Sequence, residues 1–240
     1  MTLSIVVLAG GQGSRIRGVL GDTPKLLALI NDVPFINYLL KWLEESFNSI
    51  NHQVLIATGF GHDHINNYIV SNSLSCTLIR EQKPLGTLGA AANAVERLEA
   101  NYVLVINGDT LFSCNLKQAY SQFLSTPLRP LVIVKASLTN ERYGGYAIDV
   151  EGNHLVAASS NSTLISLGAL FTTRSDLIAS RNIAIQAGII EPMMDDHFIN
   201  PNRAYPFVLQ EDTPFIDIGT PSSYAKAQIF IPSSSIFRVA

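Results

Sequence analysis

This 240-residue chain is poor in charged residues and in cysteine, and both shortages exclude classes of protein. Only 15% of its residues are charged against 47% hydrophobic, and the net charge is −3 without any run of Lys or Arg. Such a chain can bury a large core, and its charge gives no reason to expect nucleic acid or an anionic membrane as a partner. Cys76 and Cys114 are too few and too far apart for a disulfide framework or a thiolate metal site.

Long apolar runs are also missing. No stretch approaches the roughly 20 residues that a membrane-spanning helix needs. The first residues carry no positive cluster ahead of an apolar segment. Two free thiols are typical of a reducing compartment. The sequence therefore predicts a cytoplasmic protein with no membrane partner. It does not decide between a monomer and a homo-oligomer.

Apolar residues in the first half alternate between strand-like and helical spacing. This alternation predicts an α/β fold with a Rossmann-like, mixed and mostly parallel sheet, covered by helices on both faces. The expected strands are residues 3–8, 53–58, 76–79 and 102–106, and the expected helices are residues 35–43 and 90–98.

Beyond residue 130 the expected strands follow one another closely, with a hairpin turn at Glu151-Gly152-Asn153. A final helix is expected to begin near Pro221, because proline suits a first helical turn. The expected strands are residues 131–136, 146–150, 155–158, 164–171 and 204–209.

The length suits one doubly wound domain. We expect a single domain over residues 1–232, divided into a first half at about 1–130 and a second half at about 131–232. Residues 233–240 are expected to form a tail.

A glycine-rich loop after the first expected strand is the most informative feature. The strand runs into Ala9-Gly10-Gly11-Gln12-Gly13-Ser14-Arg15, and Pro24-Lys25 follows. Bare backbone N–H groups at the end of a buried strand suit a polyphosphate, and Arg15 and Lys25 add local positive charge. A glycine-rich turn without a ligand would explain the glycines alone, but the two cations weigh against it.

The spacing of this loop excludes two better-known phosphate loops. A dinucleotide fingerprint counted from Gly11 and Gly13 needs glycine or alanine at position 16, where Ile16 stands. A P-loop needs Gly-Lys-Ser/Thr, but Val19 follows Gly18.

Further motifs sit where strands are expected to end. Residues 81–89 follow a strand and open a helix, Asn107-Gly108-Asp109 follows the strand at 102–106, and Arg142-Tyr143-Gly144-Gly145 precedes the hairpin. Residues 215–221 place Asp217 at the end of another strand. Ligands of open α/β sheets bind beyond the carboxyl ends of strands, so Asp109 and Asp217 are expected to meet there. Either aspartate alone would more often be a cap than a metal ligand.

These motifs, taken in order, resemble the nucleoside-diphosphate-sugar pyrophosphorylase family of sugar-phosphate nucleotidyltransferases over residues 3–228. Within that family, Pro84-Leu85-Gly86-Thr87 and residues 215–221 are most similar to the short guanylyltransferases that act on D-glycero-D-manno-heptose 1-phosphate or mannose 1-phosphate. The resemblance implies the nucleotide-diphospho-sugar transferase fold. It also implies an enzyme that joins a nucleoside triphosphate, with GTP favoured, to a sugar 1-phosphate for polysaccharide biosynthesis.

The resemblance also implies roles for individual residues in both halves of the domain. Its first half would bind the nucleotide and its second half the sugar, with Mg²⁺ as cofactor. The implied residues are Arg15 and Lys25 for catalysis; Leu8, Ala9, Gly10, Gly11, Gly13, Ser14, Glu81, Pro84, Gly86, Thr87 and Gly108 for the nucleotide; Arg142, Tyr143, Gly144 and Gly168 for the sugar phosphate; and Asp109 and Asp217 for the metal.

Elementary chemistry agrees with these roles. A phosphate monoester with a second pKa of about 6 is already largely dianionic at pH 7, so attack on the α-phosphorus needs no general base. The obstacle is repulsion between two polyanions, and catalysis must therefore be positioning with stabilisation by cations. Arg15 would hold the β- and γ-phosphates, and Lys25 the α-phosphate and the sugar phosphate.

The sequence departs from the family at the sugar site. The usual Glu-Lys-Pro after the hairpin, whose lysine holds the sugar phosphate, is replaced by Ala158-Ser159-Ser160-Asn161-Ser162-Thr163, and Ser166 stands for the asparagine of Asn-x-Gly-x-Tyr. An enzyme would need Arg142, Lys135 or another contact in place of that lysine. The alternatives are an enzyme like the N-acetylmuramate 1-phosphate uridylyltransferases, or a nucleotide-binding regulatory homologue without turnover.

Other residues are interpreted as structural. Asp195-Asp196-His197 suggests a metal cluster, but a solvated turn is the preferred interpretation, and Met193-Met194 is interpreted as a packing contact.

Overall fold

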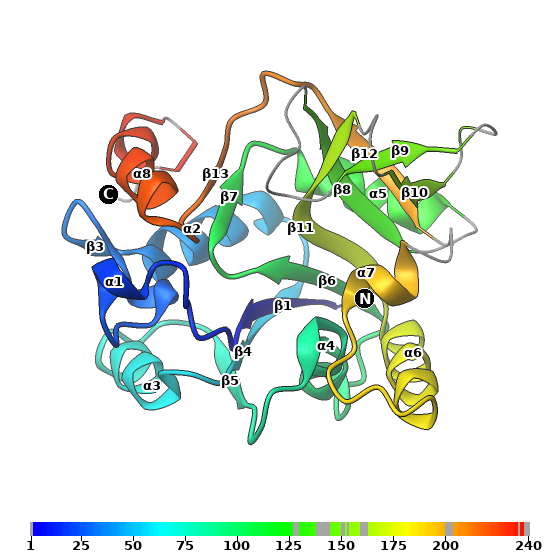
Figure 1. Cartoon of the computed structure of the whole chain (residues 1–240), viewed down its shortest axis with the longest axis horizontal. Coiled ribbons are helices and arrows are strands. Elements are labelled where there is room, and N and C mark those ends of the chain that lie inside the picture. Colours follow the sequence, from blue (N-terminus) through cyan, green and yellow to red (C-terminus); the bar gives the residue numbers. More distant parts are fainter. Residues whose placement is uncertain are drawn as a thin grey trace.

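The computed structural model describes residues 2–126, 130–137, 145–149, 152, 154–158, 163–199, 204–234 and 236–237. Its central strands are parallel, as Figure 1 shows. β1 (Leu3–Ala9) pairs with β4 (His52–Thr58) and β6 (Tyr102–Asn107), and β4 pairs with β5 (Thr77–Arg80). The apolar, β-branched composition of β1 suits a strand that is covered on both faces.

Antiparallel strands extend this sheet on the β6 side. β11 (Leu164–Thr173) pairs antiparallel with β6 and with β8 (Leu131–Ala136), and β12 (Tyr205–Leu209) lies parallel to β8. β9 (Tyr146–Ile148) pairs with β10 (Leu155–Ala157) and meets β11 at Leu164. The predicted mixed, mostly parallel sheet is confirmed.

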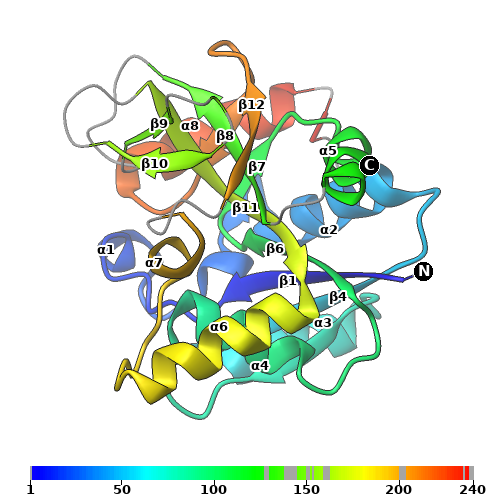
Figure 2. The ribbon, with the colours of Figure 1, turned by 90° about the vertical axis from the view of Figure 1, so that its right-hand side faces the viewer.

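Helices cover both faces of the sheet. One core cluster joins side chains of α2 (Phe35–Phe47), α3 (His62–Ser71) and α5 (Leu116–Ser125) to one face. The other cluster joins α4 (Gly86–Val95) and α6 (Arg174–Gln186) to the opposite face, where Figure 2 shows these two helices side by side. The prediction of helices on both faces is therefore confirmed.

Short elements complete the fold. Two small antiparallel sheets pair β2 (Leu29–Ile30) with β3 (Val33–Pro34), and β7 (Thr110–Phe112) with β13 (Phe215–Asp217). The short helices are α1 (Arg17–Leu20), the 3₁₀ turn Lys25–Leu27 and α7 (Met194–Phe198). In the described residues, no helix combines the length and the apolar character needed to cross a membrane.

The last helix, α8 (Pro221–Ser233), begins at the predicted proline. Thr220 caps it, because its hydroxyl accepts a hydrogen bond from the backbone N–H of Ser223 in a capping box. Within the expected tail, α8 continues to Ser233 and Phe237 is only 2% exposed. The ring of Phe237 lies edge-on to Trp42 at a centroid distance of 6.5 Å, so this part of the segment packs on the core.

Gly108 is held where β1 and β6 end. Its N–H donates to the carbonyl of Leu8 at 2.9 Å, and a Cβ added there would lie 2.8 Å from that oxygen and 3.0 Å from Val7 Cγ1. Backbone cannot yield at such a contact without moving the turn that carries Asp109. Only glycine therefore fits this position without strain.

We expect Gly108→Ala to lower the free energy of unfolding by about 1–3 kcal/mol, the usual cost of overpacking. Gly11→Ala is the matched control, because a Cβ added at Gly11 has no atom within 4 Å. Urea titration of both variants provides the measurement. Equal stability of the two variants would contradict the close contact assigned to Gly108.

Candidate functional site

The candidate site lies where parallel strands β1 and β6 end side by side. Leu8 and Asn107 are register partners, and each strand continues directly into one of the predicted motifs. β1 continues into the loop at Gly10–Gly13, and β6 into the turn that carries Asp109. The sheet thus brings the glycine loop and the first predicted metal ligand to one edge.

Lys25 and Asp109 form an ion pair in this site. The Lys25 ammonium contacts Asp109 Oδ2, and the two side chains are 23% and 19% exposed. Thr110 Oγ1 donates to Asp109 Oδ1 at 3.2 Å. The stem of Lys25 runs beside the glycine loop, since a Cβ added at Gly13 would lie 3.6 Å from Lys25 Cγ. A cation from the start of the chain therefore meets a carboxylate from the end of β6.

Asp217 reaches the same place from the far end of the sequence. It pairs with Thr110 in the β13–β7 ladder, and the N–H of Ile218 donates to the carbonyl of Asp109 at 2.9 Å. Asp217 is 7% exposed, and its Oδ1 accepts hydrogen bonds from the N–H of Gly219 at 2.8 Å and from Ser223 Oγ at 3.3 Å. The expected meeting of the two carboxylate-bearing segments is present in the structure.

These two aspartates fit a divalent cation that the substrate helps to hold. In the described residues, no group of three or more His, Cys, Asp and Glu side chains is gathered to hold a metal ion. Mg²⁺ is usually bound by one or two carboxylates with substrate phosphates and water completing its octahedron. A pair of aspartates beside the glycine loop is compatible with that requirement.

Glu81 follows β5 and covers the start of the glycine loop. A Cβ added at Gly10 would lie 2.6 Å from Glu81 Oε1, so any larger residue there would displace this carboxylate from its position. Burial raises the pKa of Glu81, and a hydrogen bond from the Leu85 backbone partly offsets the shift. A half-buried carboxylate is thus held against the loop.

Several predicted loop residues are open to solvent. Gly11, Ser14 and Arg15 are exposed, and no ion pair joins Arg15 to another of the described residues. Pro84 is exposed too, on the turn before α4. Gly11, Ser14 and Arg15 therefore have hydrogen-bond donors that solvent or a ligand can reach at the rim of the site.

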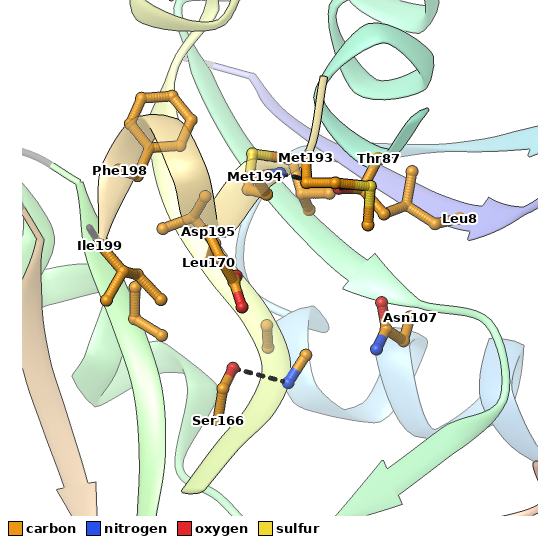
Figure 3. A pocket seen from close by; sticks show the side chains of 14 residues that line it. Leu8, Thr87, Asn107, Ser166, Leu170, Met193, Met194, Asp195, Phe198 and Ile199 are labelled. Atoms are coloured by element: carbon orange, nitrogen blue, oxygen red, sulfur yellow. Dashed lines mark hydrogen bonds between the residues drawn. The ribbon is translucent and has the colours of Figure 1, made fainter. Parts of the chain in front are cut away.

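A cavity of about 290 Å³ adjoins the Asp109 turn. Figure 3 shows Leu8 and Asn107 at one side and residues of α7 at another, around the same hollow. Gly168 on β11 has φ +68°, and a Cβ there would lie 2.1 Å from Asn107 Nδ2, so Gly168 makes room for that amide. The other described lining residues are Thr87, Val105, Val132, Ser166, Ala169, Leu170, Met193, Met194, Asp195, Phe198 and Ile199.

The segment at 191–194 docks on the start of α4. Gly86 has φ +68°, and a Cβ there would lie 2.5 Å from the carbonyl oxygen of Pro192. The N–H of Leu88 donates to that carbonyl at 3.1 Å, and the N–H of Met194 donates to Thr87 Oγ1 at 2.8 Å. The small residues of the predicted nucleotide motif therefore also accommodate this segment.

The expectation of a turn at Asp195-Asp196-His197 is wrong. These residues belong to α7, and Asp195, although exposed, lines the cavity and accepts a hydrogen bond from Tyr146 Oη at 2.5 Å. Sequence reasoning missed Asp195 and Tyr146 because they are 49 positions apart and lie in no motif. Met193 is 47% exposed at the cavity, whereas Met194 packs against the core cluster of α4 and α6 as expected.

The predicted sugar-phosphate residues are only partly described. Arg142, Tyr143 and Gly144 lie outside the described residues. Lys135 follows Val134 in β8, and alternation along the strand puts it on the face opposite to Val132, which lines the cavity. Lys135 is therefore not placed to replace the missing lysine from within the cavity.

Comparison with known proteins defines the class. A model of the nucleotidyl transferase family matches residues 4–158, so the chain belongs to this family. It is 29% identical to a D-glycero-alpha-D-manno-heptose 1-phosphate guanylyltransferase of Aneurinibacillus thermoaerophilus, over 94% of this chain and 97% of that protein. A protein with the same name from Campylobacter jejuni is 26% identical over 92% and 97%.

A solved structure is similar over the same length. The crystal structure of HddC from Yersinia pseudotuberculosis complexed with GMP-PN has a TM-score of 0.76 and 26% identity, covering 94% of this chain and 97% of that one. The predicted family and the predicted fold are both confirmed.

We expect Thr87→Val to loosen the segment at 191–194 where it docks on α4, although the bond from Leu88 N–H to the Pro192 carbonyl remains. The substitution removes the oxygen that accepts from the Met194 N–H, and one such hydrogen bond contributes about 1 kcal/mol. Hydrogen exchange at the Met194 amide should become about fivefold faster. Thr87→Ser keeps the hydroxyl and should keep the protection, and equal exchange in the two variants would contradict the assigned bond.

Proposed function

We propose that this chain joins GTP and a sugar 1-phosphate of the heptose or mannose type to give an NDP-sugar and pyrophosphate. The observation that carries the proposal is the convergence of Lys25, Asp109 and Asp217 beside a glycine loop and a cavity. Family membership and the names of the relatives support the reaction class and the substrates.

The proposed reaction is a displacement at the α-phosphorus of the nucleotide. A phosphate oxygen of the sugar 1-phosphate forms a bond to that phosphorus, the bond to the α,β-bridging oxygen breaks, and pyrophosphate leaves with the electron pair. No proton has to move for this step. What the protein must supply is alignment of the two reactants and compensation of their negative charge.

Arg15 and Lys25 would supply the positive charge. Exposed Arg15 stands at the rim, where it would hold the β- and γ-phosphates with backbone N–H groups of Gly11 and Gly13. Lys25 lies deeper and would contact the α-phosphate and the sugar phosphate. Its present contact with Asp109 supports this role, since it holds the ammonium at the turn where the phosphates would arrive.

Asp109 and Asp217 would hold Mg²⁺. A bound Mg²⁺ supplies further positive charge to the phosphate oxygens. Ser223 and Gly219 orient Asp217 through its Oδ1, and Thr110 orients Asp109. The carboxylates would have little use in a regulatory homologue that binds nucleotide without turnover, so their retention favours the enzyme.

The nucleotide would occupy the first half of the chain, residues 1–130, and the sugar mainly the second half, 131–232. Glu81 over Gly10 supports guanine as the base. A carboxylate only accepts hydrogen bonds, and guanine presents an N–H and an amino group on one edge, whereas uracil and thymine present one N–H beside an acceptor. The cytoplasmic location stays a prediction.

The test is pyrophosphate release with GTP, UTP, dTTP and CTP against a panel of sugar 1-phosphates. We expect release with GTP and a heptose or mannose 1-phosphate, dependent on Mg²⁺. Binding of nucleotide without pyrophosphate release for any pair would favour the regulatory alternative. Preference for UTP with N-acetylmuramate 1-phosphate would favour the uridylyltransferase alternative.

We expect Asp109→Asn, Asp217→Asn, Arg15→Ala and Lys25→Ala each to lower kcat by at least about 10²–10³, the usual effect of removing one electrostatic contact to a transition state. Arg181→Ala is the control, because Arg181 lies on α6, away from the loop, and pairs with Glu96 at the end of α4. Thermal unfolding checks that each variant folds. A folded aspartate variant with most of its activity at ordinary Mg²⁺ would refute the metal assignment.

We expect Glu81→Gln to shift selectivity from GTP towards UTP and dTTP, because an amide presents one acceptor and one donor. For the unaltered protein, protonation of Glu81 removes an acceptor, so GTP affinity should fall as the pH drops through its raised pKa. Exposed Glu99→Gln is the control. Competition between the triphosphates at equal concentration measures the shift, and unchanged selectivity would refute the role of Glu81.

A further inference from the structure

The cavity beside the ends of β1 and β6 has one ionisable side chain among its described lining residues, and that side chain is acidic. Asp195 contributes the carboxylate, while Asn107, Ser166 and Thr87 contribute neutral polar groups. The remaining described lining is glycine or apolar. A site that had to neutralise a negatively charged substituent would need a cation here.

Tyr146 fixes the position of this carboxylate. Its hydroxyl donates to Asp195 Oδ2 at 2.5 Å, and Tyr146 itself is 6% exposed on β9. Burial and the neighbouring Asp195 raise the pKa of Tyr146, so the hydroxyl keeps its proton and remains a donor. The contact joins β9 to α7 across one side of the cavity.

The other oxygen of Asp195 remains for a ligand. Within the described part of the chain, no side chain donates a hydrogen bond to Oδ1. Figure 3 shows Asp195 at the same hollow as Asn107 and Ser166, with the apolar side chains of Leu170 and Met194 close by. An apolar wall with few polar groups suits the C–H face of a sugar ring with its hydroxyls directed to fixed partners.

Given the proposed function, we propose that Asp195 selects a neutral polyhydroxy sugar by accepting hydrogen bonds from its hydroxyls, and that it rejects sugars that carry a carboxylate. Asn107 is two residues from Asp109, so a sugar whose phosphate lies at Lys25 would have its ring in this cavity. Tyr146 is a positioning residue that acts through Asp195. A carboxylate-bearing ring would face Asp195 without a countercharge from the described lining.

The experiment compares mannose 1-phosphate with mannuronate 1-phosphate, which differ only in a carboxylate at C6. With GTP as co-substrate, Asp195→Asn and Asp195→Ala should raise KM for mannose 1-phosphate about 10- to 100-fold, the loss expected for a charge-assisted contact. KM for GTP should stay unchanged. The preference for mannose over mannuronate should shrink by about tenfold or more.

Tyr146→Phe should raise the same KM by a few-fold, and it should add nothing further in the Asp195→Asn background, since it acts through that residue. Glu191→Gln is the matched control, because it removes a carboxylate from the same segment outside the cavity lining. An additive effect of Tyr146→Phe in the double variant would overturn its positioning role.

The outcomes separate this proposal from the proposed function. If the unaltered protein releases pyrophosphate but both Asp195 variants keep its sugar KM and its preference, only the proposal on Asp195 fails. If no sugar 1-phosphate is turned over, the proposed function fails, and calorimetric titration with GDP-mannose and GDP-mannuronate decides the proposal on Asp195. Equal affinity for the two, or binding of neither, would overturn it.

Discussion

The parallel pairing of β1 with β6 is the constraint on which the rest of the site depends. Because the two strands run in register and end together, the glycine loop and the Asp109 turn leave the sheet at one edge. The hydrogen bond from Gly108 N–H to Leu8 carbonyl continues the pairing one residue past β6. β13 then adds to β7, which begins immediately after Asp109, and brings Asp217 to the same turn. Pairing between backbones thus places the glycine loop, Asp109 and Asp217 at one turn.

Electrostatics explains why the charged groups of the site lie close together. The chain has a net charge of −3 and no basic run, so it cannot attract a polyphosphate by overall charge. The positive charge that compensates a polyphosphate would therefore have to be local, at the loop, and a partly buried ammonium needs a partner before any ligand arrives. Asp109 is the partner of the Lys25 ammonium in the structure. The same carboxylate thus orients the lysine and would accept a metal ion.

The sequence was most informative about the buried strands of the large sheet. The spacing of hydrophobic residues predicted β1, β4, β6 and β8 to within one residue at each end. Such strands can be recognised because buried strands are continuous apolar runs. α6 left no such signal, since only Leu177, Ser180 and Ala184 of its residues are buried. Asp195 was missed for a different reason: its importance arises from a contact with Tyr146 and from a cavity, and tertiary contacts between distant residues leave no local pattern.

The docking of residues 191–194 on α4 links the two halves of the molecule. Gly86 and Thr87 belong to the turn expected beside the nucleotide, yet their small size also accommodates Pro192 and the Met194 N–H. Met194 leads directly into α7, which carries Asp195 into the cavity. A larger residue at Gly86 would therefore disturb both sides at once. Glycine at this position reflects a close approach of two backbones, a requirement that a ligand-based interpretation of the motif does not include.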